Sequence, residues 1–182
     1  MSNNNSRNLF LYQEVDNSIV KDLTTEILTF NEEDRTDRDS KKNFKEKPIN
    51  LYINSYGGYV DAAFALINII ESSQTPINTI CTGVAASAAF LIFLSGSNRK
   101  AYKESRMMYH QLQQSQGDTY WDLRLYEETL KTTKLLQQRC VKYILKKTAI
   151  SKEILEDSYE HKLEWWVDSE DYSRYKIAEV ID

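Results

Sequence analysis

Ser87 is the best candidate for a nucleophile in this 182-residue chain. It follows a strand-like run (residues 77–82) and opens an apolar helical segment, and its immediate neighbours are alanines. Small neighbours let a substrate backbone approach, and the first turn of a helix offers unpaired N–H groups and a positive dipole end. Both features would stabilise the oxyanion that forms when a serine attacks a carbonyl, which is the chemistry of acyl transfer. Considered alone, the pattern also fits simple close packing of a helix on a strand.

Gly57 and Gly58 could supply a second part of the same site. They follow the β-rich run 49–54, and paired glycines free the backbone to present N–H groups to a ligand. If this turn and the Ser87 turn both end parallel strands, they meet at one edge of a sheet, where α/β proteins form their sites. A plain turn is the simpler interpretation of the glycine pair by itself.

His110 is the candidate general base. It follows the strand-like run 107–109 and can therefore reach the same sheet edge. A serine nucleophile needs a base, and imidazole is the usual one. The other histidine, His161, lies in a short charged run, so we expect no catalytic role for it. A purely structural role remains the alternative for His110 when it is considered alone.

Other catalytic signatures are missing from the sequence. It has no G-x-S-x-G motif, which excludes an α/β-hydrolase, and no G-x-x-x-x-G-K-[ST] loop, so we do not expect ATP hydrolysis by this chain. Cys81 and Cys140 form no C-x-x-C pair or cysteine–histidine cluster. We therefore expect two buried, reduced thiols, no metal site and no cofactor.

The elements that must position these residues alternate between strand and helix, which predicts a single α/β domain over residues 1–182 with a largely parallel sheet. The expected strands are residues 9–12, 49–54, 77–82, 107–109 and 179–181, and the expected helices are residues 19–28, 60–70, 88–95, 119–147, 152–157 and 169–175. The mostly charged segment 31–47 is expected to be a solvated loop or an extension of the preceding helix.

The stretch 119–147 is amphipathic and could reach roughly 40 Å at about 1.5 Å per residue. A domain of this size cannot cover so long a helix. Its apolar stripe, which includes Leu130 and Leu136, should therefore project and require a partner.

The bulk composition excludes several classes of protein. The hydrophobic fraction of 41% is that of a folded domain, and a net charge of -4 argues against a dedicated nucleic-acid binder. The polar N-terminus lacks the apolar run of a signal peptide, and the longest apolar run, 84–94, is too short to span a bilayer. We expect a cytoplasmic protein without nucleic-acid or membrane partners.

Three segments resemble motifs of the proteolytic subunit of Clp proteases. Residues 49–58 (Ile-Asn-Leu-Tyr-Ile-Asn-Ser-Tyr-Gly-Gly) resemble that family's strand and glycine turn, residues 83–89 (Gly-Val-Ala-Ala-Ser-Ala-Ala) its nucleophile motif, and residues 106–111 (Arg-Met-Met-Tyr-His-Gln) its histidine motif. The order and approximate spacing agree, and the resemblance extends over residues 9–181.

This resemblance implies a crotonase-like α/β fold of ββα units, with residues 111–147 as a projecting handle. It also implies a serine endopeptidase with Ser87 as nucleophile and His110 as base, and an oxyanion hole made by the backbone N–H groups of Gly58 and Ala88. In the family, heptameric rings stack handle to handle around a chamber, and a separate Clp-type AAA+ ATPase feeds in unfolded proteins. The same partners and substrates are therefore implied here.

The chain also departs from the family pattern. Tyr56 stands where the family usually has proline, the charged loop is longer than usual, and the polar N-terminus leaves docking to an ATPase open. Alignment through Trp166 puts Glu164 at the position of the third triad residue, usually aspartate, and leaves Asp168 to cap the next helix. We expect Glu164 to contact the His110 ring nitrogen that lies far from Ser87. Such divergence resembles phage-borne or accessory members.

Two alternatives remain at this point. The chain could be a catalytically weak or inactive ring subunit that modulates another peptidase, a hypothesis that the changes at Tyr56 and Glu164 favour. It could also be a crotonase-type acyl-CoA enzyme with the same fold, but that hypothesis gives Ser87 and His110 no joint role.

Overall fold

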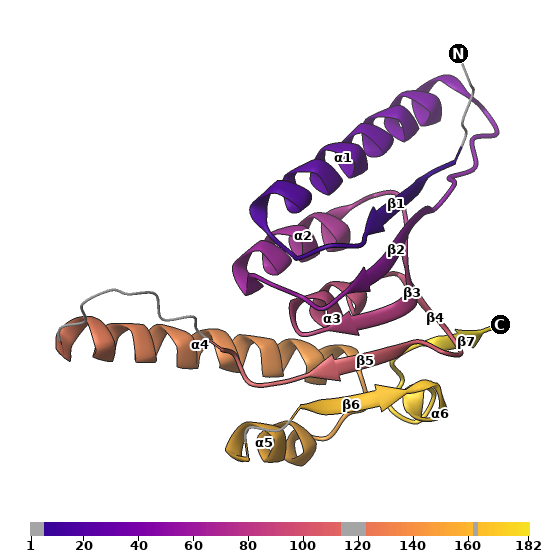
Figure 1. Cartoon of the computed structure of the whole chain (residues 1–182). Helices are drawn as coiled ribbons and strands as arrows, with labels where there is room; N and C mark the ends of the chain where they lie inside the picture. The colour runs from indigo at the N-terminus through magenta and orange to yellow at the C-terminus, as the bar shows by residue number, and fades with distance from the viewer. Residues whose placement is uncertain (1–5, 114–122, 162–163) are drawn as a thin grey trace.

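The computed structural model describes residues 6–113, 123–161 and 164–182. Strands and helices alternate along the chain (Figure 1), as predicted for an α/β protein. The elements are β1 (Asn8–Leu11), α1 (Asn17–Ser40), β2 (Ile49–Ser55), α2 (Val60–Ser72), β3 (Ile77–Ala86), α3 (Ala88–Phe93), β4 (Asn98–Tyr102), β5 (Arg106–Tyr109), α4 (Leu123–Lys147), α5 (Lys152–Glu160), β6 (Trp165–Asp168), α6 (Ser169–Tyr172) and β7 (Glu179–Ile181).

The sheet is mainly parallel. In the described part of the chain it has seven strands, of which five follow in the order β1-β2-β3-β4-β7. Strand β3 has two successive partners on one side, because residues 78–81 pair with β4 and residues 84–86 pair with β5. Strand β6 then pairs with β5 in the antiparallel direction. The change of partner brings the ends of β3 and β5 to a common edge, which Ser87 and His110 follow.

Helices α1, α2 and α3 pack on one face of the sheet and bury its apolar side chains (Figure 1). On β2, Ile49, Leu51 and Ile53 are fully buried, and the residues between them are more exposed, as the two-residue period of a strand requires. All six residues of α3 are buried. The short helix that follows Ser87 is therefore held within the core.

The opposite face of the sheet is open around β1 and β2. Phe10 is 54% exposed and stacks on Tyr52, with 5.5 Å between the ring centroids. Tyr12 is also exposed, and its hydroxyl is hydrogen-bonded to the Thr82 hydroxyl at 2.9 Å. An uncovered aromatic surface of this kind is typical of a face that meets another protein.

Four asparagines form a ladder across the starts of four parallel strands. Asn8, Asn50, Asn78 and Asn98 lie opposite one another in register. Each side-chain amide donates to the next, from Asn98 to Asn78 at 2.9 Å, from Asn78 to Asn50 at 3.0 Å and from Asn50 to Asn8 at 3.1 Å. A slip of one residue in any pair would break the array, so the ladder reinforces the register.

The charged segment 31–47 is not a loop over its first part, because α1 continues to Ser40. Asp34 is the reason, as it is 2% exposed and accepts hydrogen bonds of 2.7 and 2.6 Å from the Arg7 guanidinium. Burial opposes the charge of Asp34, but the hydrogen bonds from Arg7 and Thr75 hold its pKa below the ordinary value. These contacts attach the end of α1 to the residue before β1 and to the α2–β3 connection. Of the two predictions for segment 31–47, the extension of the preceding helix was therefore correct as far as Ser40.

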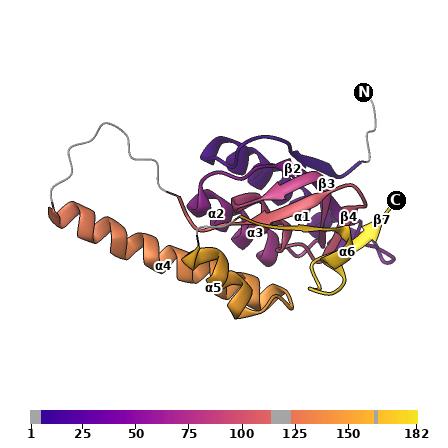
Figure 2. The ribbon, with the colours of Figure 1, turned by 60° about the horizontal axis from the view of Figure 1, so that its bottom comes forward.

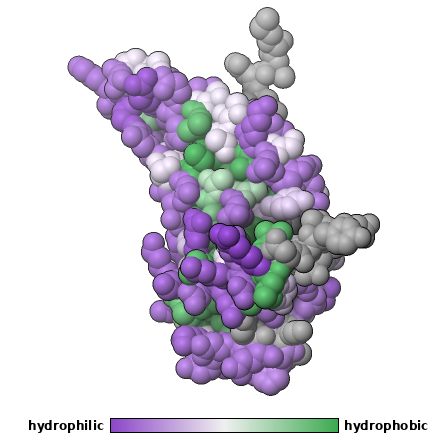
Figure 3. All heavy atoms as spheres, turned by 90° about the vertical axis from the view of Figure 1, so that its left-hand side faces the viewer, coloured by the Kyte–Doolittle hydropathy of each residue, from purple (hydrophilic) through white to green (hydrophobic). Residues whose placement is uncertain are grey.

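Helix α4 projects from the body of the domain, as predicted for a handle (Figures 1 and 2). It begins at Leu123, and the expected helical residues 119–122 lie outside the described part of the chain. Figure 3, which views the side to which α4 points, shows apolar side chains gathered among hydrophilic ones. Leu123 and Leu130 are 76% and 42% exposed, whereas Leu136 packs against the core. Among the described helices, none is long and apolar enough to cross a lipid bilayer.

Candidate active site

Ser87 joins β3 to α3 in a backbone conformation that few residues adopt. Its φ is 54° and its ψ is -122°, and Lys176 is the other non-glycine residue of the described chain with positive φ. Holding a non-glycine residue there costs on the order of 1–3 kcal/mol, and such strain is typical of functional sites. The Ser87 N–H donates to the Met108 carbonyl at 2.8 Å, which fixes the turn to β5. Ser87 is half-buried between two buried alanines, so its hydroxyl stays within reach of solvent.

The glycine turn after β2 lies directly against the Ser87 turn, as the sequence predicted. A Cβ added to Gly57 would lie 2.7 Å from the Ala86 carbonyl oxygen, 2.8 Å from the Ser87 Cβ and 2.9 Å from the Ala88 nitrogen. No side chain fits at these distances, and the φ of Gly57, 104°, also favours glycine. Glycine is therefore required for the two turns to meet.

The N–H groups of Gly58 and Ala88, proposed as an oxyanion hole, belong to these two turns. Ala88 is the first residue of α3, where N–H groups have no partner within the helix. Gly58 is held by Val15, whose N–H donates to the Gly57 carbonyl at 2.8 Å and whose carbonyl accepts from the Tyr59 N–H at 2.8 Å. Neither of these bonds uses the Gly58 N–H.

His110 directly follows β5, which pairs in parallel with the last residues of β3. Ala86 lies opposite Met108, so the chain positions of Ser87 and His110 leave adjacent strands at one edge. Burial lowers the pKa of His110, and the negative charge of Glu164 partly opposes this effect. A neutral imidazole at pH 7 is the form that accepts a proton. The Ser87 hydroxyl and the imidazole are not hydrogen-bonded to each other in the part of the chain that the structure describes.

The two acidic candidates have different surroundings. Asp168 caps α6, where its carboxylate accepts from the Glu170 N–H at 3.2 Å, as predicted. Glu164 is exposed and accepts a 3.0 Å hydrogen bond from the Trp166 indole N–H instead of from His110. The expected Glu164–His110 hydrogen bond is thus not formed, and the His110 Nδ1 is buried without a hydrogen-bond partner among the described residues. The role of Glu164 stays a prediction.

Gln137 of α4 supports the histidine segment, a role that the sequence analysis missed. Its amide donates to the Tyr109 hydroxyl and accepts from the Leu112 N–H at 2.9 Å. The residues on both sides of His110 are thereby tied to the handle helix. The available signal was a glutamine within the apolar face of an amphipathic helix, where a buried amide needs partners.

Hollows lie on both sides of Gly58. One, of about 410 Å³, is bordered by Tyr12 and by the chain from Asn54 to Gly58, including the 71% exposed Tyr56. The other, of about 440 Å³, lies between the start of α2, residues 112–113 and the Thr132–Leu136 part of α4. The surface is thus hollowed on either side of the glycine turn.

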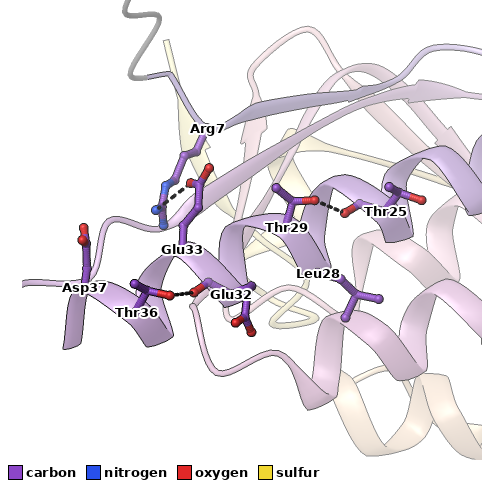
Figure 4. A pocket seen from close by; sticks show the side chains of 8 residues that line it. All are labelled: Arg7, Thr25, Leu28, Thr29, Glu32, Glu33, Thr36 and Asp37. Atoms are coloured by element: carbon purple, nitrogen blue, oxygen red, sulfur yellow. Dashed lines mark hydrogen bonds and ion pairs between the residues drawn. The ribbon is translucent and has the colours of Figure 1, made fainter. Parts of the chain in front are cut away.

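A larger hollow of about 790 Å³ lies along the outer side of α1 (Figure 4). Most of its lining residues are polar or charged, and none of the residues discussed above for catalysis belongs to it. The lining residues are Arg7, Thr25, Leu28, Thr29, Glu32, Glu33, Thr36 and Asp37.

The fold and site define an α/β protein of crotonase-like architecture with a projecting helix and a serine, a histidine and a glycine turn on one sheet edge. The chain belongs to the Clp protease family, whose model (Clp protease) matches residues 2–181. A solved structure, a mutant of ClpP1 from Listeria monocytogenes, has the same fold, with a TM-score of 0.78 and 23% identity over 98% of this chain and 92% of that chain. The fold expected from the sequence is therefore confirmed.

Curated relatives carry the description ATP-dependent Clp protease proteolytic subunit 2. The one from Thermobifida fusca is 32% identical over 68% of this chain and 57% of its own length. The one from Prochlorococcus marinus subsp. pastoris is 38% identical over 58% of this chain and 48% of its own length. The chain thus spans about half the length of the curated relatives that it matches.

Proposed function

We propose that this chain is a serine endopeptidase subunit in which Ser87 is the nucleophile and His110 the general base. The observation that carries the proposal is the close contact between the Gly57 backbone and the Ser87 turn. This contact brings a strained serine, a helix start and a glycine turn together. Few purely structural turns need all three features at one point.

In the proposed reaction, the Ser87 Oγ attacks the carbonyl carbon of a peptide bond and its proton passes to His110. The Gly58 and Ala88 N–H groups hold the negative oxygen of the tetrahedral intermediate. The imidazolium then gives its proton to the departing amine, and an acyl-enzyme remains. Water, deprotonated by His110, releases the acyl group and restores Ser87. Glu164 is the proposed partner of the imidazolium. No metal or cofactor takes part in these steps.

The proposed substrates are unfolded proteins, delivered by a separate Clp-type AAA+ ATPase in the cytoplasm. The proposed assembly is a pair of stacked heptameric rings that meet through α4. Two features support this assembly, the exposed leucines of the projecting helix and the open aromatic face at Phe10 and Tyr52. Such surfaces are stable in water when another subunit covers them.

A catalytically weak ring subunit is the second candidate, and one observation favours it. The His110 Nδ1 lacks a partner within the described chain, because Glu164 is engaged by Trp166. A histidine without an orienting carboxylate is a poorer base.

Labelling with a fluorophosphonate separates the two candidates, because the reagent requires an activated serine. We expect the intact protein to gain one label per chain in its mass spectrum and the Ser87→Ala variant to gain none. Labelling of Ser87→Ala at the rate of the unmodified protein would disprove the nucleophile assignment. Absence of labelling in both proteins would support the catalytically weak subunit.

A further inference from the structure

Glu164 has two possible partners on one face of the β5–β6 pair. Met108 lies opposite Trp166 in the antiparallel register, which ends with Tyr109 opposite Trp165. His110 and Glu164 are the next residues, and one further step of the same register would place them opposite each other. Side chains alternate between the faces of a sheet, so all four residues share one face. The Glu164 carboxylate, just before β6, is therefore close both to the Trp166 indole and to His110.

The Glu164 carboxylate is hydrogen-bonded to Trp166 and not to His110. The Trp166 Nε1–H donates to Glu164 at 3.0 Å, whereas the buried His110 Nδ1 has no hydrogen-bond partner in the described residues. Buried polar atoms are nearly always paired, so an unpaired one beside a carboxylate needs an explanation.

The position of the Trp166 ring is set by packing and not by this hydrogen bond. The Arg106 guanidinium lies over the ring at 4.5 Å from its centroid. The ring also packs against a small buried cluster formed by Val84, Ala86 and Met108. The indole N–H is thus presented at a fixed point, and the exposed Glu164 side chain is the part that can turn.

We propose that Trp166 is a positioning residue that holds the Glu164 carboxylate away from His110, so that catalysis requires the carboxylate to pass from the indole N–H to the imidazole Nδ1–H. This inference rests on the proposed function, in which Glu164 serves His110. The transfer changes only side-chain torsions, and no covalent bond is made or broken. Protonation of His110 during the reaction drives it, because a charged imidazole binds a carboxylate more strongly than a neutral indole does.

The charged groups around His110 make the transfer measurable. On the shared face, β5 contributes Arg106 and β6 contributes Asp168, and Glu164 directly precedes β6. Arg106 and Asp168 lie opposite each other, at the end of the strand pair away from His110. Strand β3 and helix α3 contain no charged residue. Glu164 is the group whose charge acts on the imidazole. Any movement of this carboxylate must therefore change the pKa of His110.

The test replaces Trp166 by phenylalanine, which keeps an aromatic ring under Arg106 and removes the N–H. The chain has two histidines, so NMR of protein with isotope-labelled histidine resolves both, and His161→Gln assigns them. We expect Trp166→Phe to raise the pKa of His110, because the released carboxylate approaches the imidazole. We also expect a several-fold faster reaction of Ser87 with the fluorophosphonate.

The control is the double variant Glu164→Gln/Trp166→Phe, in which both increases should disappear. A merely structural role of Trp166 would change activity without a pKa change that depends on Glu164. If the pKa of His110 is unchanged or lowered in Trp166→Phe, the inference is wrong. If Trp166→Phe fails to fold, the indole N–H resonance of Trp166 can be compared between the unmodified protein and Glu164→Gln. We expect this resonance to shift in Glu164→Gln. An unshifted resonance would contradict the hydrogen bond between Trp166 and Glu164.

The outcomes also separate this inference from the proposed peptidase function. A Glu164-dependent rise of the His110 pKa without labelling of any variant would support the holding role of Trp166 and reject the peptidase. Labelling of the unmodified protein without a rise of the His110 pKa in Trp166→Phe would support the peptidase function and reject the holding role of Trp166.

Discussion

A Cβ on Gly57 would lie 2.8 Å from the Cβ of Ser87, a distance that real side chains do not reach. The φ of Gly57 is also positive, at 104°. We therefore expect Gly57→Ala to strain its own backbone and displace the Ser87 turn. The free energy of unfolding should fall by roughly 3 kcal/mol, and fluorophosphonate labelling should be lost. Urea unfolding and intact mass measure the two effects.

Gly83→Ala is the matched control for this change. Its Cβ would meet the side-chain amide of Asn54 at 2.7 Å, and a side-chain amide can move where a backbone cannot. We expect a loss of about 1 kcal/mol and continued labelling. Equal loss of labelling in both variants would show that the contact between the Gly57 and Ser87 turns is not what the site requires.

Ser87→Gly should make the protein inactive and more stable. The φ of 54° at this position strains serine but not glycine, while glycine loses more backbone entropy on folding. The relief exceeds the entropic cost, so we expect a gain of about 1 kcal/mol. Ser87→Ala keeps the strain and should leave stability almost unchanged. Chemical unfolding of the three proteins measures this order, and a less stable Ser87→Gly would show that the turn is unstrained.

The labelling rate should remain high at pH values at which an ordinary histidine is already protonated. Burial holds the pKa of His110 below its usual value, which is near 6.5, so the acid limb of the pH profile should lie below about 6.5. Glu164→Gln removes the charge that raises this pKa and should move the limb to still lower pH. An acid limb above the ordinary value would contradict the burial of the imidazole.

The same group should affect stability, with a definite sign. Folded His110 binds a proton less readily than unfolded His110 does. Its contribution is therefore fully present above the unfolded pKa and is lost as pH falls below about 6.5. His110→Gln should flatten the fall of unfolding free energy in this range. An unchanged slope would show that another group causes it.

The asparagine ladder predicts a graded loss of stability. Asn50→Ala removes two of the amide hydrogen bonds and Asn98→Ala removes one. At about 1 kcal/mol for each bond we expect losses of roughly 2 and 1 kcal/mol. Urea unfolding measures both, and equal losses would show that the four amides do not act as a ladder.

The exposed part of α4 should hold the assembly together. Leu130 is 42% exposed, so Leu130→Glu should split the assembly without unfolding the subunit. Leu136 packs against the core, so Leu136→Glu should also lower the melting temperature. Native mass spectrometry and thermal unfolding separate the effects, with Lys131→Glu as a control that changes charge alone. An intact assembly in Leu130→Glu would contradict the role proposed for α4.

The order of strands and helices was enough to predict that the Gly57 turn lies against the Ser87 turn and that His110 follows a strand next to β3. The carboxyl ends of neighbouring parallel strands share an edge, and each of these residues follows such a strand. The residue types in the turns also indicate this contact, since glycines and a serine among alanines leave room for two turns to approach each other closely.

The third acid was harder to predict because it depends on long-range pairing and on side-chain torsions. The aromatic run at residues 165–167 gives no clear strand period, yet it forms most of β6 and places Trp165 opposite Tyr109, the residues next to Glu164 and His110. Whether Glu164 then turns to Trp166 or to His110 is a choice between rotamers that no sequence pattern encodes. Strand β4 was missed for a similar reason, because its polar composition hides a pairing that the neighbouring strands provide.

The two cysteines have a consequence for chemical modification of this chain. Both thiols are buried, and burial raises the pKa of Cys81 to about 11 and that of Cys140 to about 12. At neutral pH almost no thiolate is present, so both cysteines should react slowly with alkylating reagents and mild oxidants. A cysteine introduced at an exposed position such as Arg124, in the first turn of α4, would therefore be the reactive one. A dye attached there would test in real time whether α4 takes part in the proposed assembly, without prior removal of the native thiols.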